Sequence, residues 1–478
     1  MSAKRQIRAF KNSPTSLTSL PPELLIEILK ASDWRDVLQV RKTCITLNQI
    51  TRAKSLWQYF LGGQSEKHAV PWSALEKPAE HYSASEIEWI FLRWKSVEIS
   101  LRKDSCSPLR EHRIRLPSSV DTAHFLTGGR WILVLTETGA VYYCDLEATK
   151  IKPTLLIPCP FNAPGTIDSL MSVDESRDTA LLSFNIAIFT EDWKKAEASI
   201  RSQIAVYRVT LVLDSQHNST GFAVTCLSTF HPGHLRATVI SIELRGPHIA
   251  RLIRPDPPLE LLNYIEVFDW KLLNGSESKM TTKRNIICHA DIRSLRLLPD
   301  SRIMVYNGVC VLMLDLLKFS ESTHPPELPQ PDATFPSLWS MVAITQDIMF
   351  SSVFTHSDKP HIIFYIAGAI MGVTWASGNS TLPKIEVLPL SIRPTFETLR
   401  QSPEFSYHMG TTWSRRRRKL VFIRFNWPGE ALDSESGVTY CDMKNSWGSS
   451  LLPMEVASGR LAYRSNSFLH VAQLGSLT

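Results

Sequence analysis

The segment Leu20–Leu61 reads LPPELLIEILKASDWRDVLQVRKTCITLNQITRAKSLWQYFL and packs several short amphipathic patterns into about forty residues. Two prolines follow Leu20, and proline suits the first turn of a helix because its missing N–H would be unpaired there anyway. Leucine and isoleucine then recur at helical spacing, which predicts one apolar stripe with charged residues beside it. Asp33 is a good N-cap for a second helix. Further apolar residues mark a third helix and a last helical turn, at Cys44, Leu47, Ile50, Leu56, Trp57, Tyr59 and Phe60.

A unit of this size cannot bury all of that apolar surface by itself, because domains of about forty residues are marginal without staples or partners. The pattern therefore predicts a helical module that docks by an apolar helix face in a groove, either onto the rest of this chain or onto another protein. A plain N-terminal helical cap on a larger domain is the alternative.

The same residues resemble a known family. The runs SLPPELLIEIL (Ser19–Leu29), DVLQVRKTC (Asp36–Cys44), LNQIT (Leu47–Thr51) and SLWQYF (Ser55–Phe60) are similar to the F-box domain in the version common in fungal proteins. The resemblance covers residues 17 to 61, and the double proline, the Arg-x-Thr-Cys step and the Leu-Trp pair occur in the usual order. Ile45 stands where the family usually has a basic residue, at an edge position of the motif.

The resemblance implies docking on a Skp-type adaptor and, through it, on the cullin of a cullin-RING (SCF-type) ubiquitin ligase. The rest of the chain would then bind the protein that is ubiquitinated, and the identity of that protein is not readable from the sequence. We expect the adaptor to be contacted by Leu20, Pro21, Pro22, Leu24, Leu25, Ile28 and Leu29, with Val37, Leu38 and Trp57 supporting the helix pack.

Residues 1–16 form a basic, polar tail, which we expect to be flexible, and residues 62–96 form a linker that contains one further helix. Gly62 and Gly63 suit the end of the preceding helix. Ser85 and Glu88 resemble a capping box ahead of the run EIEWIFLRW, which predicts the linker helix. We expect this helix to pack between the docking module and the domain that follows.

From about residue 97 to residue 478 the helical periodicity fades and short strand-like runs take over. Seven units each combine apolar runs with turns that contain Gly or Asn, and each could form a sheet of about four strands. The units are Arg130–Ala148, Asp178–Leu213, Pro247–Gly275, Asp300–Leu316, Lys359–Asn379, Arg417–Trp447 and Gly459–Leu474. The predicted fold class is therefore a multidomain α plus all-β protein with a seven-bladed β-propeller; an open β-solenoid or two β-sandwiches would give similar strand counts.

The last unit is the shortest, so its missing outer strand is expected from Val97–Leu101 or His112–Pro117, which would close the ring and remove an exposed sheet edge. The most hydrophobic run, His361–Ala376, is shorter than the 18 or more apolar residues of a membrane helix and is interrupted at Ala367-Gly368. It predicts a buried hairpin, and no membrane partner is expected.

Composition is that of an ordinary globular protein, with 44% hydrophobic and 21% charged residues and a net charge of +6. This charge is slight for 478 residues, so a nucleic-acid partner is not expected. The N-terminal stretch lacks the apolar core of a secretory signal, and the eight cysteines show no CxxC spacing. We therefore expect free thiols in a reducing compartment and a cytoplasmic or nuclear location.

No nucleotide, zinc-protease or nucleophile-elbow motif is present, so the sequence predicts a non-catalytic subunit without cofactor or metal. Cys226, His231 and His234 could in principle ligate a metal ion, but the sequence shows no fourth ligand nearby. The basic run Arg415–Lys419 suits a solvated hairpin turn, a site that binds acidic segments or a nuclear import signal. The carboxylate pairs Asp174-Glu175 and Glu191-Asp192 are expected in solvated loops.

The sequence leaves three functional hypotheses, of which a substrate receptor of a ubiquitin ligase is the first. Its mechanism is proximity, because holding two proteins together raises their effective concentration. A propeller-type enzyme with a site in the central channel and a scaffold that does not lead to degradation are the alternatives. Which rim of the propeller binds a partner is not readable from the sequence.

Overall fold

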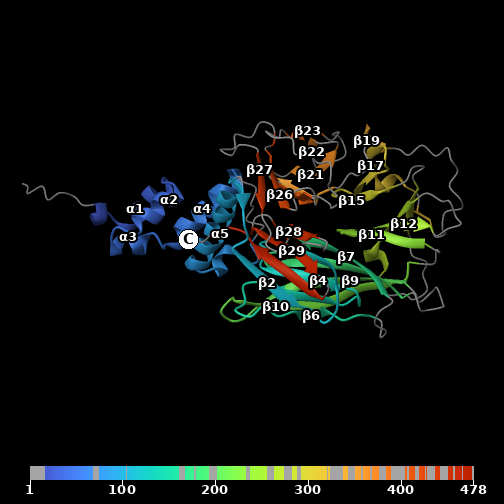
Figure 1. Cartoon of the computed structure of the whole chain (residues 1–478), viewed down its shortest axis with the longest axis horizontal. Helices are drawn as coiled ribbons and strands as arrows, with labels where there is room; N and C mark the ends of the chain where they lie inside the picture. The colour runs from blue at the N-terminus through green and yellow to red at the C-terminus, as the bar shows by residue number, and fades with distance from the viewer. Residues whose placement is uncertain are drawn as a thin grey trace, which may run out of the picture. The chain divides into compact units, whose positions relative to one another are not determined.

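The computed structural model divides into two compact units, a helical unit (Met1–Trp72 and Ala79–Leu92) and a β unit (Ser73–Pro78 and Arg93–Thr478) (Figure 1). The structure describes residues 17–67, 75–103, 105–160, 167–176, 179–192, 202–232, 237–255, 263–273, 283–287, 292–319, 321–322, 337–342, 350–351, 353–356, 359–366, 369–375, 384–388, 404–405, 409–414, 419–425, 427, 437–441, 451–455, 458–465 and 467–475.

Short helices make up the helical unit, as the sequence predicts. They are η1 (Leu17–Ser19), α1 (Pro22–Lys30), α2 (Trp34–Val40), α3 (Ile45–Ile50), α4 (Lys54–Lys67), η3 (Ala79–His81) and the first half of α5 (Ala84–Leu101). Proline occupies the start of α1, and Asp33 caps α2 by accepting a hydrogen bond of 2.8 Å from the Arg35 amide.

Two local predictions about helix ends are wrong. Helix α4 does not end at Gly62 and Gly63 but continues to Lys67. Glycine disfavours a helix by only about 1 kcal/mol, which the packing of the preceding turn on the core can override. The capping box of α5 is formed by Ser83 and Glu86, whose side chains each bond the other's backbone N–H, so the predicted cap residue Ser85 lies inside the helix.

The described residues of the β unit form seven sheets, numbered here as blades 1 to 7. Blade 1 contains β3 (Val120–Phe125), β4 (Trp131–Thr136), β5 (Val141–Asp145) and β6 (Thr154–Ile157). Blade 2 contains β7 (Ile167–Ser176), β8 (Ser183–Asp192), β9 (Ser202–Leu213) and β10 (Ser219–Phe230). Blade 3 contains β11 (Ala237–Arg245), β12 (His248–Pro255), β13 (Tyr264–Asp269), β14 (Lys283–Ile287) and β18 (Glu321–Ser322).

The remaining blades have the same antiparallel order, apart from β1, which joins blade 6 in parallel. Blade 4 contains β15 (Ser294–Leu298), β16 (Arg302–Tyr306), β17 (Cys310–Asp315) and β19 (Ser337–Val342). Blade 5 contains β20 (Phe354–His356), β21 (Lys359–Ile366), β22 (Ala369–Thr374) and β23 (Lys384–Leu388). Blade 6 contains β24 (Glu404–Phe405), β25 (Met409–Ser414), β26 (Lys419–Arg424), β27 (Gly437–Cys441) and β1 (Ser105–Cys106); blade 7 contains β28 (Leu451–Glu455), β29 (Arg460–Ser465), β30 (Phe468–Gln473) and β2 (Arg110–Arg115).

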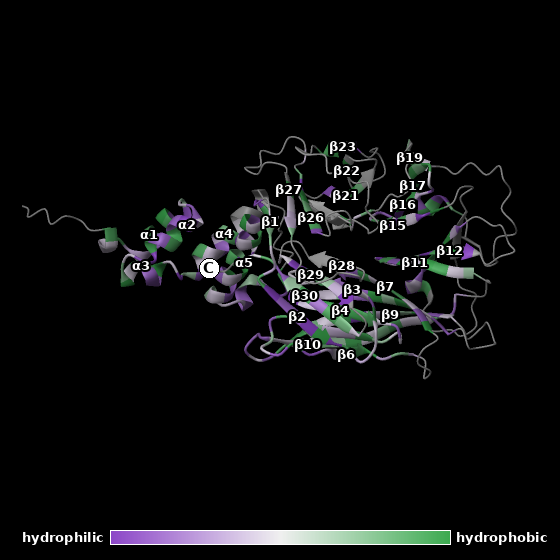
Figure 2. Cartoon of the chain, viewed as in Figure 1, coloured by the Kyte–Doolittle hydropathy of each residue, from purple (hydrophilic) through white to green (hydrophobic). Residues whose placement is uncertain are grey.

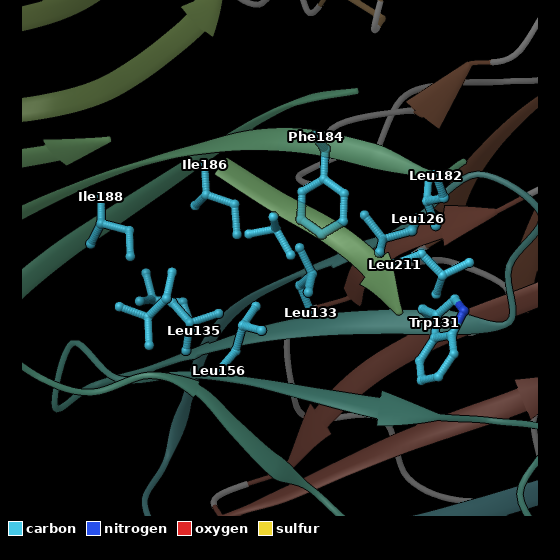
Figure 3. Packing of buried hydrophobic residues seen from close by; sticks show 13 residues of the cluster. Leu126, Trp131, Leu133, Leu135, Leu156, Leu182, Phe184, Ile186, Ile188 and Leu211 are labelled. Carbon is cyan, nitrogen blue, oxygen red and sulfur yellow. The ribbon is translucent and has the colours of Figure 1, made fainter. Parts of the chain in front are cut away.

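Successive blades share buried apolar cores. Between blades 1 and 2, for example, Leu133 and Leu135 of β4 lie in one cluster with Phe184 and Ile186 of β8 (Figure 3). Equivalent clusters join blades 2 to 3, 3 to 4 and 4 to 5, and Trp427 joins blades 5 and 6 by packing on Gly372 and His361. Blade 7 shares one cluster with blade 6 and another with blade 1. The seven sheets therefore form a closed ring, and the predicted β-propeller is confirmed.

Strands from before the first blade complete the last two blades. Strand β2 pairs antiparallel with β30, from Arg110 opposite Gln473 to Arg115 opposite Phe468, and this confirms the closing strand predicted at His112–Pro117. The alternative at Val97–Leu101 is wrong, because those residues are the last turns of α5. Strand β1 adds to β27 in parallel. Both additions cover edges that would otherwise expose unpaired backbone groups.

The hydrophobic run His361–Ala376 is the hairpin of β21 and β22, as predicted. Ile362, Phe364 and Val373 are completely buried in the core that blade 5 shares with blade 4. In Figure 2, coloured by hydropathy, both apolar and polar residues are visible along helices α1 to α3. Among the residues that the structure describes, no helix has the length and apolar content needed to cross a bilayer.

A repeated aspartate turn escaped the sequence reasoning. The carboxylates of Asp145, Asp269 and Asp315, which end the third strands of blades 1, 3 and 4, each accept the N–H two residues further on, at 2.9, 3.1 and 3.0 Å. The residue after each aspartate is buried: Leu146, Trp270 and Leu316. In the sequence, this turn corresponds to a strand that ends in Asp and is followed by an apolar residue. Aligning the strand-like units on this Asp would have revealed the repeat.

Gly372→Ala should destabilise the β unit by about 1–3 kcal/mol, because an added Cβ would lie 2.2 Å from the Trp427 ring and a packed core resists extra volume. Urea unfolding, followed by intrinsic fluorescence, measures the loss. Gly246→Ala is the control, since nothing lies within 4 Å of its Cβ and only the positive φ of 55° opposes the change. Equal unfolding midpoints for Gly372→Ala and wild type would contradict the packing of Trp427 on blade 5.

Candidate functional site

The core of the helical unit is an aromatic cluster centred on Trp57 of α4, whose side chain is completely buried. Its ring centroid lies 5.8 Å from that of Phe60 and 5.7 Å from that of Phe91, and Trp34 of α2 meets Phe91 edge-on at 6.1 Å. The indole N–H of Trp57 donates a hydrogen bond of 2.9 Å to the carbonyl oxygen of Thr51. The cluster thus fixes α2, α4 and the first half of α5 against one another.

Helix α1 has two apolar faces with different environments. Leu25 and Leu29 are only 2% and 5% exposed and belong to the core, whereas Leu24 and Ile28 are 52% and 48% exposed. Each pair is four residues apart, so each forms a short stripe along the helix. The outer stripe, Leu24 and Ile28, is therefore exposed on a helix that Leu25 and Leu29 hold in the core. This arrangement suits a surface that docks into a partner's groove.

The predicted contact residues separate into three groups in the structure. Leu25, Leu29, Val37 and Trp57 are buried, Pro21, Pro22, Leu24 and Ile28 are exposed, and Leu20 and Leu38 are half-buried. The exposed group lies at the start of α1 and on its outer stripe. Periodicity in the sequence identified all of these side chains as apolar but could not separate the core-facing stripe from the outer one.

The comparison with protein families decides what this helical arrangement is. Residues 17–61 match the family model described as F-box-like. The N-terminal module is an F-box-like domain. F-box domains bind Skp-type adaptors, and the family consists of interaction modules. A comparison with curated proteins gives no match to the chain.

Solved structures similar to this chain include three β-propellers. The WD40 domain of SCAP from fission yeast has 9% identity and a TM-score of 0.37, with 77% of this chain and 98% of that chain covered. The RRP9 WD40 repeats have 10% identity and a TM-score of 0.37, with 77% and 99% covered. The β-propeller domain of Cps50 (Swd1) from Myceliophteria thermophila has 10% identity and a TM-score of 0.43, with 76% and 99% covered. The propeller assignment for this chain follows from its own seven sheets and their closed packing.

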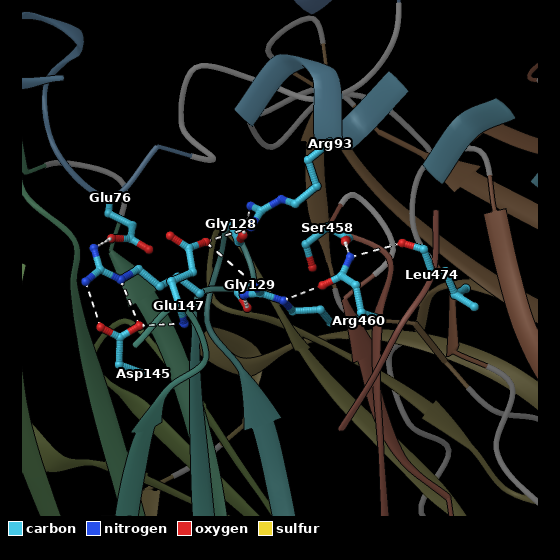
Figure 4. A network of polar contacts seen from close by, with 11 residues as sticks. Glu76, Arg93, Gly128, Gly129, Asp145, Glu147, Ser458, Arg460 and Leu474 are labelled. Carbon is cyan, nitrogen blue, oxygen red and sulfur yellow. Dashed lines mark hydrogen bonds and ion pairs between the residues drawn. The ribbon is translucent and has the colours of Figure 1, made fainter. Parts of the chain in front are cut away.

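The β unit carries a second group of organised polar side chains, at the loops that join the first to the second and the third to the fourth strands of the blades (Figure 4). Arg130 forms a two-pronged ion pair with Asp145, at 2.7 and 3.0 Å, and also approaches Glu76 at 3.7 Å. Arg93 of α5 bonds Glu147 at 2.7 Å and the Gly128 carbonyl at 2.9 Å. We call the side of the ring on which Arg93, Gly128, Arg130, Asp145 and Glu147 lie the α5 edge.

Glycines leave room for α5 on the same edge. A Cβ on Gly459 would lie 2.4 Å from a methyl group of Val97, and one on Gly475 would lie 2.9 Å from the Ser96 hydroxyl. Both glycines have positive φ values, of 67° and 90°. Val97 and Leu101 are buried in the core shared by blades 6 and 7. The end of α5 is therefore packed into the β unit.

Residues 75–78 cover a neighbouring part of the α5 edge. The Glu76 carbonyl accepts a hydrogen bond of 2.7 Å from the Leu182 amide, and the Lys77 ammonium donates one of 2.9 Å to the His217 carbonyl. Burial raises the pKa of Glu76 to about 7, although the positive charge of Arg130 opposes the rise. Part of the Glu76 population is consequently protonated at neutral pH.

The carboxylate pairs predicted in solvated loops lie in strands instead. Asp174 and Glu175 belong to β7, and Glu191 and Asp192, 8% and 3% exposed, end β8. Burial acts to raise the pKa of Glu175, but hydrogen bonds from His124 and Thr127 hold it below its ordinary value. Each carboxylate of the first pair connects two blades, since Asp174 also accepts the Gly246 amide at 2.7 Å.

Within the part of the chain that the structure describes, no group of His, Cys, Asp or Glu side chains is placed to hold a metal ion. The Cys226 thiol lies 3.4 Å from the Thr229 hydroxyl, and a ring nitrogen of His231 lies 2.8 Å from the Ser202 carbonyl oxygen. His234 and residues 415–418 of the basic run lie outside the described residues.

Glu76→Gln should make the β unit more stable at pH 8 by on the order of 1–3 kcal/mol and leave it nearly unchanged at pH 4.5. The pKa of Glu76 rises from 4.5 to about 7 on folding, so the folded state binds more protons in that window and the stability contribution is lost as pH rises through about 7. Urea unfolding of both proteins from pH 4.5 to pH 8 measures the difference. Glu137→Gln, at an exposed loop position of the same unit, is the control, and a pH-independent difference for Glu76→Gln would refute the linkage.

Proposed function

We propose that this protein is a substrate-receptor subunit of an SCF-type ubiquitin ligase. The F-box-like domain would dock on a Skp-type adaptor and through it on cullin, and the propeller would hold the target protein. The observation that carries the proposal is the combination, in one chain, of the F-box-like segment at residues 17–61 with an exposed apolar stripe on α1.

The geometry of α1 supports docking rather than a structural cap. Leu24 and Ile28 are about half exposed on a helix whose adjacent stripe, Leu25 and Leu29, is buried in the core. Burying such a stripe in a groove stabilises a complex by roughly 25 cal/mol per Å² of apolar surface removed from water. Because α1 is already ordered by the core, little conformational entropy is lost when a partner covers the stripe.

The propeller supports the second half of the proposal as a platform. A closed ring in which each blade packs against its two neighbours is a rigid scaffold, and its loops are free to vary in sequence and to contact a partner. Catalysis in this proposal is proximity: the target is held near a ubiquitin-conjugating enzyme that the rest of the complex supplies. The chain itself then needs neither cofactor nor metal, and its place of action is the cytoplasm, the nucleus or both.

Leu24→Asp combined with Ile28→Asp should weaken adaptor binding at least a hundredfold, because two carboxylates would have to lose their water in an apolar groove. Titration calorimetry of the full chain with a purified Skp-type adaptor measures the loss. Circular dichroism should be unchanged, since both positions face solvent. Leu25→Asp is unsuitable for this test because Leu25 is 2% exposed and its charge would unfold the module.

The matched control is Leu272→Asp combined with Leu317→Asp, which places the same charges at leucines of the β unit that are 70% and 63% exposed. Control protein should bind the adaptor as wild type does. Wild-type protein that fails to bind the adaptor would end the proposal. Affinity purification then tests the ligase role: recovery of cullin with the adaptor supports a receptor, and recovery of the adaptor without cullin supports a non-degradative scaffold.

A further inference from the structure

The F-box-like segment does not complete its own core. Phe91 of α5 is 1% exposed and packs on Trp34, Trp57 and Phe60, which belong to α2 and α4. Residues 79–92 lie outside the matched range 17–61 but inside the same compact unit. The docking module as a folded object therefore extends past the segment that the family pattern defines.

Arg41 is the polar counterpart of this aromatic contact. It follows the last turn of α2, and its guanidinium donates two bonds to the Glu88 carboxylate, at 2.5 and 3.1 Å. The same guanidinium bonds the Thr51 side chain at 3.2 Å and the Thr51 carbonyl at 3.0 Å, and it lies 5.5 Å from the centre of the Trp57 ring. One side chain thus connects α2, the turn between α3 and α4, and α5.

This pair differs from an ordinary surface ion pair. The Arg41 and Glu88 side chains are only 17% and 16% exposed, and the geometry is the two-pronged one that fixes orientation as well as distance. Exposed pairs contribute little to stability, but a shielded pair with additional hydrogen bonds leaves an uncompensated charge when one partner is removed. Loss of Glu88 should therefore loosen the contact of α5 with the other helices.

The position of the outer stripe on α1 depends on the same contacts. Helix α1 packs against α3 and α4, and α4 is held by Trp57, whose N–H and whose neighbour Arg41 converge on the Thr51 carbonyl. A shift of α4 would tilt α1 and with it Leu24 and Ile28. Displacement of about 1 Å at a docking surface is enough to lose a large part of the binding free energy.

We propose that Arg41 and Glu88 form a positioning clamp for the adaptor-docking surface, so that Glu88, outside the F-box-like segment, sets the adaptor affinity without touching the adaptor. The inference rests on the proposed function. It identifies a specific residue pair through which α5 completes the docking module.

The experiment is a binding cycle with the full chain and a purified Skp-type adaptor. Glu88→Gln should weaken binding about five- to thirtyfold, chiefly through faster dissociation, with the helix content seen by circular dichroism unchanged. Arg41→Met should give a loss of similar size. The double variant should bind no more weakly than the worse single variant, because both substitutions break one unit.

The matched control is Glu98→Gln, which removes a carboxylate of the same helix that pairs with Lys95 and Arg102. Its adaptor affinity should equal that of wild type. If wild type binds the adaptor and Glu88→Gln binds equally well, or if the two losses simply add in the double variant, the clamp is refuted while the proposed function stands. If wild type does not bind the adaptor, the proposed function itself fails.

Discussion

The pairing of β2 with β30 is the constraint on which the β unit depends. A ring of sheets is stable only when the last sheet meets the first, and here blade 7 obtains its outer strand from residues that precede blade 1. Ile114 of β2 lies in the core shared by blades 7 and 1, so the same strand contributes both backbone hydrogen bonds and apolar packing to the closure. Without this closure, the faces of blades 7 and 1 that meet in the shared core would be uncovered.

Polar contacts between neighbouring blades reinforce the apolar cores. Arg464 of blade 7 donates to the carbonyls of Val120 and Asp121 in blade 1, Glu175 of blade 2 binds back to blade 1, and Arg296 of blade 4 pairs with Glu243 of blade 3. Such contacts give hydrogen-bond partners to buried backbone and carboxylate groups. A buried polar group without a partner would destabilise the fold by about 1–3 kcal/mol. They also fix the rotation of one blade against the next, which apolar contact alone does not specify.

Sequence reasoning succeeded where one physical signal dominates. Alternating and continuous apolar runs located the central strands of all seven blades, because burial on both faces leaves little freedom in composition. The starts of α1 at Pro22 and of α2 after its N-cap Asp33 follow from local chemistry, so they could also be predicted from the sequence. The F-box resemblance gave the class of module, which the family comparison supports independently.

Prediction failed where long-range contacts decide. Nothing local distinguishes Leu24 from Leu25, since only the packing of α1 on the rest of the unit buries one and exposes the other. Glu88 has the spacing of a cap residue from Ser85, but its partner is Arg41, 47 positions earlier in the chain. The carboxylates of β7 and β8 were expected in water because acidic pairs usually are exposed. The β7 carboxylates instead bind groups of neighbouring blades that are distant in the sequence, so local sequence could not predict those contacts.

The order in which the chain is synthesised gives the closing strand a further consequence. The helical unit lies within the first 92 residues of the chain. It can therefore fold on the ribosome while most of the propeller is still to be synthesised. Strand β2, in contrast, has to wait for β30, near the end of the chain. A nascent chain would therefore present its F-box-like surface well before its propeller ring can close.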